Sequence, residues 1–239
     1  MGDFRKIALI VAAGSSSRMG MITPKQFQPI GGIPLAVHPG LVFREAFPDI
    51  ELVYAIASGT AQIWEQLLST FFPGGNWRLC MGGKSRYESV CNGIRSIRET
   101  DTWVAVHDGA RPFIRSNEIR RAFRVATEKG NSVFAVPVKD SLRMVDSNGK
   151  SRFLDRSGIM QVQTPQIFQL SQMLDAYTAE ADPRFTDDAT VMELAGHAIY
   201  LCEGSYDNIK ITTPEDWVVA ENIFTQRSKE SAFREPENG

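Results

Sequence analysis

The chain has 239 residues and contains few cysteines. The three cysteines, Cys80, Cys91 and Cys202, are widely spaced and form no CxxC pair. An odd number of distant cysteines predicts reduced, mostly buried thiols, and it excludes a disulfide framework or a cysteine-based zinc site. This cysteine usage is typical of a protein of the cytoplasm.

A strong net charge and a long apolar segment are absent as well. The formal net charge is −2, which excludes a general attraction to nucleic acid or to an anionic membrane. The first apolar run follows Asp3, Arg5 and Lys6 and is too short to span a bilayer or to serve in a signal peptide. We therefore expect a cytoplasmic protein without nucleic-acid or membrane partners, and any cation-rich site must be local.

Apolar runs of strand length alternate with amphipathic stretches of helix length. This alternation predicts an α/β fold with a parallel sheet that is covered on both faces. Ligands of such sheets bind beyond the carboxyl ends of the strands. The expected strands are 7–11, 52–57, 77–81, 103–107 and 132–138, and the expected helices are 33–47, 61–71, 85–97 and 117–129.

The pattern changes after Val138, where short alternating pieces surround Asn148-Gly149. Asn-Gly between two such pieces indicates a hairpin, so residues 139–162 are expected to form a β-arm. A projecting hairpin is marginally stable alone, which favours packing of the arm against a second subunit of a homodimer.

The chain then returns to the main body. We expect helices at about 170–181 and 188–195, a strand near 199–202 and a strand-like run at 207–212. Thr213 and Pro214 suit the cap and first turn of a last helix. Residues 1–226 are therefore expected to form one domain, followed by a charged, disordered tail at 227–239.

The first loop has the sequence AAGSSSRMG at 12–20 and is followed by PKQF at 24–27. It lacks the GK[ST] ending of a Walker A loop and the second glycine of GxGxxG. Small residues after a strand allow a ligand to approach the backbone, and Arg18 and Lys25 add two cations. The two side chains are candidates to hold nucleotide phosphates and to offset charge at an attacked phosphorus. The alternative is a pair of solvated loop cations.

Two further loops follow later strands. Gly82-Gly83 precedes a helix that Ser85 could cap, and Ser89 could contact a base or ribose; the alternative is an ordinary turn with Arg86 in solvent. Asp108 ends a central strand and is a candidate Mg²⁺ ligand, while Arg111 could hold a second phosphate. His107 is interpreted as structural, because an ionised phosphate nucleophile needs no general base.

Two cations of the second half complete the candidates. Arg156 lies on the return of the predicted arm, where it could contact a neighbour's substrate or remain a solvated hairpin cation. Lys210 interrupts an alternating run and suits a substrate phosphate, and the alternative is an edge lysine with its stem packed on apolar neighbours.

Several motifs together resemble those of the 2-C-methyl-D-erythritol 4-phosphate cytidylyltransferase family. They occur in the family's order, from about Ile7 to Phe224: AAGSSSRMG…PKQF, GGKSRYESV, VHDGARPF, VPVKDS, LDRSG, QTPQIF, FTDDAT and DNIKITTPED. The resemblance implies a Rossmann-like nucleotidyltransferase fold, a three-layer sandwich with a β-arm, acting as a homodimer. It implies a reaction of CTP with methylerythritol phosphate that gives the CDP-alcohol and pyrophosphate, with Mg²⁺.

The resemblance also implies roles for individual residues. Arg18 and Lys25 match the residues that stabilise the transition state, and Arg156 and Lys210 match those that position the acceptor phosphate, Arg156 coming from the partner's arm. Nucleotide-binding positions are matched by Ala12, Ala13, Gly14, Ser15, Gly83, Ser89 and Gly109. The acceptor pocket is matched by Asp108, Arg111, Ser141, Arg156, Thr164 and Lys210.

Three positions depart from the family pattern. Lys84 stands where an acidic residue is common, Gly109 replaces a usual alanine, and Ser141 replaces a usual threonine but keeps the hydroxyl group.

Two alternatives to this function remain. A ribitol 5-phosphate cytidylyltransferase shares the first loop, but residues 154–158 and 185–189 look more like the methylerythritol phosphate enzyme. A non-catalytic domain of the same fold would be expected to lack Arg18, Lys25 or Lys210, and all three are present.

Overall fold

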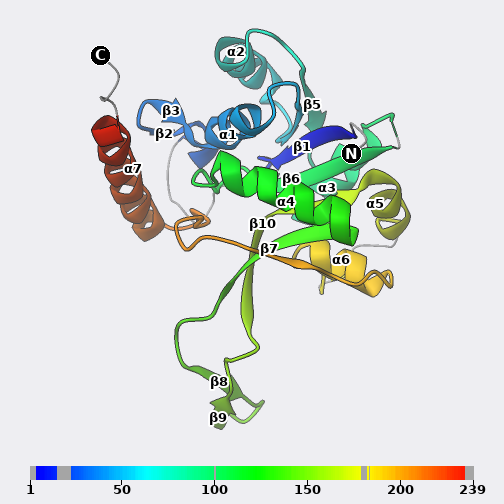
Figure 1. Ribbon diagram of the computed structural model, residues 1–239, viewed down its shortest axis with the longest axis vertical. Coiled ribbons are helices and arrows are strands. Elements are labelled where there is room, and N and C mark those ends of the chain that lie inside the picture. Colours follow the sequence, from blue (N-terminus) through cyan, green and yellow to red (C-terminus); the bar gives the residue numbers. More distant parts are fainter. Residues whose placement is uncertain (1–3, 15–22, 100, 179–181, 183, 235–239) are drawn as a thin grey trace.

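The computed structural model describes residues 4–14, 23–99, 101–178, 182 and 184–234. Its centre is a seven-stranded sheet with the strand order β11-β7-β10-β6-β1-β4-β5 (Figure 1). The strands are β1 (Arg5–Val11), β4 (Glu51–Ile56), β5 (Trp77–Met81), β6 (Thr102–Asp108), β7 (Asn131–Pro137), β10 (Met160–Gln169) and β11 (Leu201–Glu203).

The sheet is mostly parallel, as the alternation of strands and helices predicts. β1 pairs in parallel with β4 on one side and with β6 on the other, and Val11 lies opposite Asp108. β10 runs antiparallel to both β6 and β7. The chain thus moves outward from β1 through β4 to β5 and then returns to β6, which creates a switch point at β1 where ligands of α/β sheets bind.

Helices cover both faces of the sheet, which gives three layers. α1 (His38–Ala46), α2 (Ala61–Phe71) and α4 (Ser116–Lys129) share one apolar core with the sheet. α3 (Arg86–Arg95), α5 (Leu170–Ala176) and α6 (Asp188–Leu194) share the other. β4 and β6 are buried along their whole length, as expected for strands covered on both faces.

The predicted helix at 33–47 is wrong in its first part. Ile33–Pro34 forms β3, which pairs with β2 (Pro29–Ile30), and a 3₁₀ turn, η3 (Leu35–Val37), precedes α1. Pro34 is extended, at φ −55° and ψ 137°, and it has no N–H to donate to a helix. A helix becomes possible only at His38, with Pro39 in its first turn, where the missing N–H does no harm.

The predicted hairpin is present and projects from one end of the molecule (Figure 1). β8 (Leu142–Val145) and β9 (Ser151–Leu154) pair antiparallel. The Asp146 carboxylate accepts hydrogen bonds from the backbone N–H groups of Asn148 and Lys150, and Gly149 supplies the positive φ of the turn, 78°. Val145 and Phe153 are 61% and 73% exposed, which leaves apolar surface uncovered within one chain.

The last helix, α7 (Pro214–Arg234), begins where the sequence predicts. The Thr213 hydroxyl accepts a hydrogen bond from the N–H of Asp216 at 3.3 Å, which confirms the cap. The prediction of a disordered tail from 227 is wrong for residues 227–234, which continue α7, and Arg227 donates to the carbonyl of Phe113 at 2.9 Å. Within the described ranges, every helix is too short or too polar to cross a bilayer.

α7 docks on the β2–β3 hairpin through Phe224. The ring of Phe224 occupies the space that a Cβ of Gly31 would need, whereas nothing lies within 4 Å of the corresponding position at Gly32. Both glycines have positive φ, 58° and 80°. The pair therefore separates the effect of backbone conformation from that of the Phe224 contact.

We expect Gly32→Ala to lower the free energy of unfolding by about 1 kcal/mol, the strain of a left-handed alanine. Gly31→Ala should lower it by a further ~2 kcal/mol, because Phe224 must move out of its packed position. Urea denaturation of both variants measures the difference. Equal destabilisation would contradict the packing role assigned to Phe224.

Candidate active site

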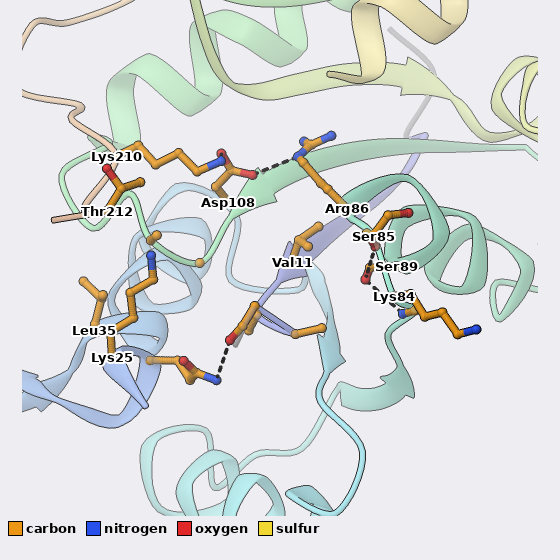
Figure 2. A pocket seen from close by; sticks show the side chains of 17 residues that line it. Val11, Lys25, Leu35, Lys84, Ser85, Arg86, Ser89, Asp108, Lys210 and Thr212 are labelled. Carbon is orange, nitrogen blue, oxygen red and sulfur yellow. Dashed lines mark hydrogen bonds and ion pairs between the residues drawn. The ribbon is translucent and has the colours of Figure 1, made fainter. Parts of the chain in front are cut away.

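A cavity of about 490 Å³ opens at the carboxyl ends of β1, β5 and β6 (Figure 2). It lies at the switch point of the sheet, where the first loop and the loops after β5 and β6 converge. Its lining residues are Val11, Ala12, Ala13, Gly14, Lys25, Gln26, Leu35, Gly83, Lys84, Ser85, Arg86, Ser89, Asp108, Gly109, Ala110, Lys210 and Thr212.

The loops after β1 and β5 lie against each other because one of them begins with glycine. A Cβ at Gly82 would collide with the side chain of Ala13, so a larger residue would push the two loops apart. The N–H of Gly82 also donates to the carbonyl of Ile56 at 2.8 Å, which continues the pairing of β4 with β5 beyond the strand end. The small residues therefore form a narrow wall of backbone at one side of the cavity.

The predicted cap of α3 is confirmed. The Ser85 hydroxyl accepts a hydrogen bond from the N–H of Glu88 at 3.1 Å. The Ser89 hydroxyl donates to the Ser85 carbonyl at 2.8 Å and accepts from the N–H of Gly83 at 3.0 Å. Ser89 thus holds the glycine loop in place, and its direct contact with a base or ribose stays a prediction.

Lys25 begins a single 3₁₀ turn, η2 (Lys25–Phe27), at the floor of the cavity. Its ammonium group donates to the carbonyl of Ile211 at 2.7 Å, next to Lys210 in the sequence. The neighbouring Gln26 amide donates to the carbonyl of Gly14 at 3.3 Å and so joins this turn to the first loop. Arg18 and Ser15, the other candidates of the first loop, lie outside the described residues.

Asp108, the last residue of β6, collects three cations. Its Oδ1 contacts Arg86 Nε at 3.0 Å, and its Oδ2 contacts Lys210 Nζ at 2.9 Å and Arg111 Nε at 3.5 Å. Figure 2 shows Lys210 and Arg86 reaching it from opposite sides. Burial by itself raises the pKa of the Asp108 carboxyl, but Arg86, Lys210 and Arg111 outweigh burial and hold this pKa well below its usual range. Asp108 is therefore a fixed anion.

His107 precedes Asp108 and faces the interior. Its Nε2 lies 3.0 Å from the carbonyl of Arg111, which can only accept, so Nε2 carries the proton. Nδ1 then accepts from the hydroxyl of Thr164 at 3.1 Å, and the same hydroxyl accepts from the N–H of Asp108. Burial lowers the pKa of His107 to about 4, so the imidazole is neutral at physiological pH, in agreement with its structural interpretation.

The segment at 207–212 forms no strand, contrary to prediction, but it is held firmly. The N–H of Ile211 donates to the Ala110 carbonyl at 2.9 Å, and Arg111 donates to the carbonyl of Asn208 at 2.7 Å. The buried Asn208 amide donates to the carbonyl of Thr164 at 2.8 Å. Side chains and loop backbone thus replace a sheet ladder and place Lys210 over Asp108.

The part of the chain that forms this cavity matches a known family of proteins. The family model for 2-C-methyl-D-erythritol 4-phosphate cytidylyltransferase matches residues 6–226, which include every described residue that lines the cavity. The chain belongs to this family.

Individual members of the cytidylyltransferase family agree. The enzyme of Bacillus cytotoxicus is 37% identical over 218 residues, which cover 90% of this chain and 96% of that protein. The enzyme of Alkaliphilus oremlandii is 36% identical, with 92% and 94% covered. The crystal structure of 4-diphosphocytidyl-2C-methyl-D-erythritol synthase from Anaerococcus prevotii superposes with a TM-score of 0.80 at 26% identity, and it covers 93% of this chain and 96% of that one.

Some predicted site residues of this cytidylyltransferase do not line the cavity. Thr164 and Arg111 lie behind Asp108 and hold it and Asn208 in place. Ser141 and Arg156 lie on the exposed arm of the same chain. Direct contacts of these four side chains with substrate stay predictions.

The metal prediction at Asp108 receives no support from the donor set. Among the described residues, no cluster of three histidine, cysteine or acidic side chains could hold a metal ion. Asp108 is the one carboxylate among the described lining residues, and both of its oxygens contact cations. These residues do not by themselves fit a Mg²⁺ site of the kind that carboxylates form.

Arg86 and Asp188 belong to the site although sequence patterns did not indicate them. The alternative for the glycine loop places Arg86 in solvent, whereas it lines the cavity and contacts Asp108 and Asp188. In FTDDAT, Asp187 accepts from the N–H of Thr190 as the cap of α6, and Asp188 follows in the first turn, where an acidic residue is common. The sequence therefore carries no local sign of the pair that Asp188 forms with Arg86.

The neutral state of His107 predicts a pH-dependent stability. In the unfolded chain its pKa returns to about 6.5, so the unfolded state binds more protons than the folded state between pH 6.5 and about 4. The contribution of His107 is therefore complete above pH 6.5 and is lost as pH falls to about 4, by about 3 kcal/mol. Urea denaturation across this range should show a shallower fall for His107→Gln than for the wild type. Parallel pH profiles would contradict the assignment of a neutral His107.

Proposed function

We propose that this protein transfers CMP from CTP to 2-C-methyl-D-erythritol 4-phosphate, giving 4-diphosphocytidyl-2-C-methyl-D-erythritol and pyrophosphate. The observation that carries the proposal is one cavity at the switch point that joins the small-residue loops to Lys25, Asp108 and Lys210. Family membership over residues 6–226 favours this acceptor over ribitol 5-phosphate. Because Lys25 and Lys210 are present and line the cavity, a purely non-catalytic domain is disfavoured as well.

The nucleotide occupies the half of the cavity between the first loop and the glycine loop. Ala13, Gly14 and Gly83 present backbone there, and backbone approaches a base and ribose closely only where side chains are small. Lys25 lines the cavity there, so its charge meets the triphosphate. Arg18 lies outside the described residues, and its contact with the triphosphate is proposed from the family resemblance alone. Gly109 lines the facing wall after β6.

The acceptor phosphate occupies the other half, over Asp108. The Lys210 side chain is 39% exposed although its Nζ contacts the almost fully buried Asp108, so it offers donors to a ligand. Arg156 of a second subunit is proposed to approach the same phosphate from its arm. The α-phosphate of CTP and the acceptor phosphate then lie close to Lys25 and Lys210. These two lysines are near each other because the Lys25 ammonium group donates to the carbonyl of Ile211, the residue after Lys210.

The reaction is an in-line displacement at phosphorus. An oxygen of the acceptor phosphate forms a bond to the α-phosphorus of CTP, and the bond from this phosphorus to the bridging α–β oxygen breaks, so pyrophosphate leaves with the electron pair. The attacking oxygen is already ionised, and His107 is neutral, buried and bonded to Arg111 and Thr164. The residues therefore position charge rather than transfer a proton.

Mg²⁺ is proposed to enter with the triphosphate of CTP. Mg²⁺ commonly takes several of its ligands from substrate phosphates and water. Both oxygens of Asp108 are already bound by cations, so this carboxylate is assigned to Arg86 and Lys210 and not to the metal.

Loss of the Lys25 ammonium should slow the reaction. We expect Lys25→Ala to remain folded and to reduce kcat by about a hundredfold, equivalent to about 3 kcal/mol of transition-state stabilisation. The measurement is pyrophosphate release with CTP and either methylerythritol phosphate or ribitol 5-phosphate. Lys129→Ala, in the last turn of α4, is the matched lysine control and should be neutral. A folded Lys25→Ala enzyme with wild-type kcat would rule out this role.

The proposal of a homodimer is based on the β8–β9 arm. Its exposed Val145 and Phe153 lie on a two-stranded hairpin that makes no sheet with the body. Packing against a second copy would cover this surface and bring Arg156 to the partner's cavity.

Mixed dimers test this arrangement. Arg156→Ala and Lys25→Ala subunits should each be weak alone, but a mixed dimer contains one complete site, so mixing should restore about a quarter of wild-type activity. Mixing Lys25→Ala with Lys210→Ala is the control, because both residues belong to the same chain's cavity and no complete site can form. Recovery in the control, or none in the first mixture, would contradict a site shared across the dimer.

A further inference from the structure

Arg86 connects two carboxylates that lie far apart in the sequence. Its Nη1 and Nη2 form a fork on Asp188, at 2.9 Å from Oδ1 and 2.7 Å from Oδ2. Its Nε donates to Oδ1 of Asp108 at 3.0 Å. A guanidinium group offers this geometry because its donors lie in one plane and point in different directions. A lysine could not satisfy both carboxylates in this way.

Asp188 does not line the cavity, and its position is fixed by contacts in the protein interior. It is fully buried at the start of α6, and the hydroxyl of Tyr177 donates to its Oδ1 at 2.6 Å. Tyr177 stacks on Tyr87, with ring centroids 4.8 Å apart, and Tyr87 stacks in turn on Phe185. Asp188 therefore has a fixed position in an aromatic wall.

The helix cap does not require Asp188. The adjacent Asp187 accepts from the N–H and hydroxyl of Thr190, and Asp187 also accepts from the amide of Gln166 at 3.0 Å. The two neighbouring aspartates thus have different partners: Asp187 caps α6, and Asp188 binds Arg86.

The orientation of Asp108 depends on Arg86. Oδ1 of Asp108 receives Arg86, which leaves Oδ2 for Lys210 at 2.9 Å. Without Arg86, the carboxylate could turn and offer either oxygen to Arg111 or Lys210. The Lys210 ammonium group ends at this carboxylate, so its position follows that of its anionic partner.

We propose that Asp188 and Arg86 are positioning residues for the acceptor phosphate: they fix Asp108 so that Lys210 is held at the cavity. The inference rests on the proposed function for the identity of that phosphate. Neither residue needs to touch the substrate, and each acts through Asp108 on Lys210.

The test compares Asp188→Asn with Asp187→Asn. Asp188→Asn keeps the shape and removes the charge that orients Arg86, so we expect the KM for methylerythritol phosphate to rise about tenfold or more. The KM for CTP should change by less than about threefold, because Asp188 bonds the side chains of Arg86 and Tyr177 and not the glycine-loop backbone assigned to the nucleotide. Asp187→Asn weakens the cap of α6 and serves as the control for a purely structural effect. It should leave both KM values close to those of the wild type.

A second pair of variants separates position from stability. Arg86→Lys keeps the charge but loses the fork, so it should raise the KM for the acceptor as Asp188→Asn does, and it carries the test if Asp188→Asn fails to fold. The double variant Arg86→Gln with Asp188→Asn removes both charges of the buried pair. It should regain thermal stability relative to Asp188→Asn without regaining the acceptor KM.

Calorimetry with inorganic phosphate supplies a readout that does not need turnover. Asp188→Asn should weaken phosphate binding toward the level of Lys210→Ala, and Asp187→Asn should not. If the wild-type enzyme did not turn over CTP and methylerythritol phosphate, the proposed function would be wrong. The phosphate affinities of the variants would still test whether Asp188 and Arg86 position Lys210 through Asp108. Equal acceptor KM values and phosphate affinities in Asp188→Asn and Asp187→Asn would show the network to be wrong.

Discussion

The site depends on one buried anion at the end of a central strand. Asp108 lies opposite Val11 at the switch point of the sheet, and Arg86, Arg111 and Lys210 meet on its two oxygens. These cations come from α3, from the turn after β6 and from the irregular segment before α7. A buried carboxylate without partners would be costly, and the partly buried Arg86 and Arg111 would each lose an ionic partner without it. Each component of this group thus requires the others.

The fold brings these components together through its topology. The chain moves outward from β1 to β5 and returns to β6, so the loops after three parallel strands open at one edge. The antiparallel return of β10 then brings Thr164 beside Asp108, where its hydroxyl accepts the Asp108 N–H. The segment at 207–212 supplies Lys210, the last member of this group. The Lys25 ammonium group donates to the carbonyl of Ile211, which joins the nucleotide half of the cavity to the acceptor half.

Local patterns in the sequence predict most strands of the sheet, its helices, the arm and the cap at Ser85, because these depend on apolar periodicity and on neighbouring residues. They do not predict β10 (Met160–Gln169), the antiparallel strand between β6 and β7. The helix at 33–47 is predicted too long because its apolar spacing outweighs Pro34, which is extended and keeps the helix from starting before His38. Lys25, Asp108 and Lys210 are found because each is an unusual charge beside a strand end or an apolar run. Arg86 is missed because its burial depends on Asp188, 102 positions away. A pattern read over a short stretch of sequence cannot show that two residues so far apart form a pair.

The charges of this group explain how a phosphate site can be ready before its ligand arrives. Arg86, Arg111 and Lys210 outnumber Asp108 and Asp188 by one positive charge. Lys210 is paired with Asp108 although its side chain is 39% exposed, so part of its ordering is complete in the folded protein. An incoming phosphate therefore meets an ammonium group that is already in position, and its negative charge compensates the excess cation. Preorganised charge of this kind needs no rearrangement when charge develops during reaction, which is where such sites gain most of their rate.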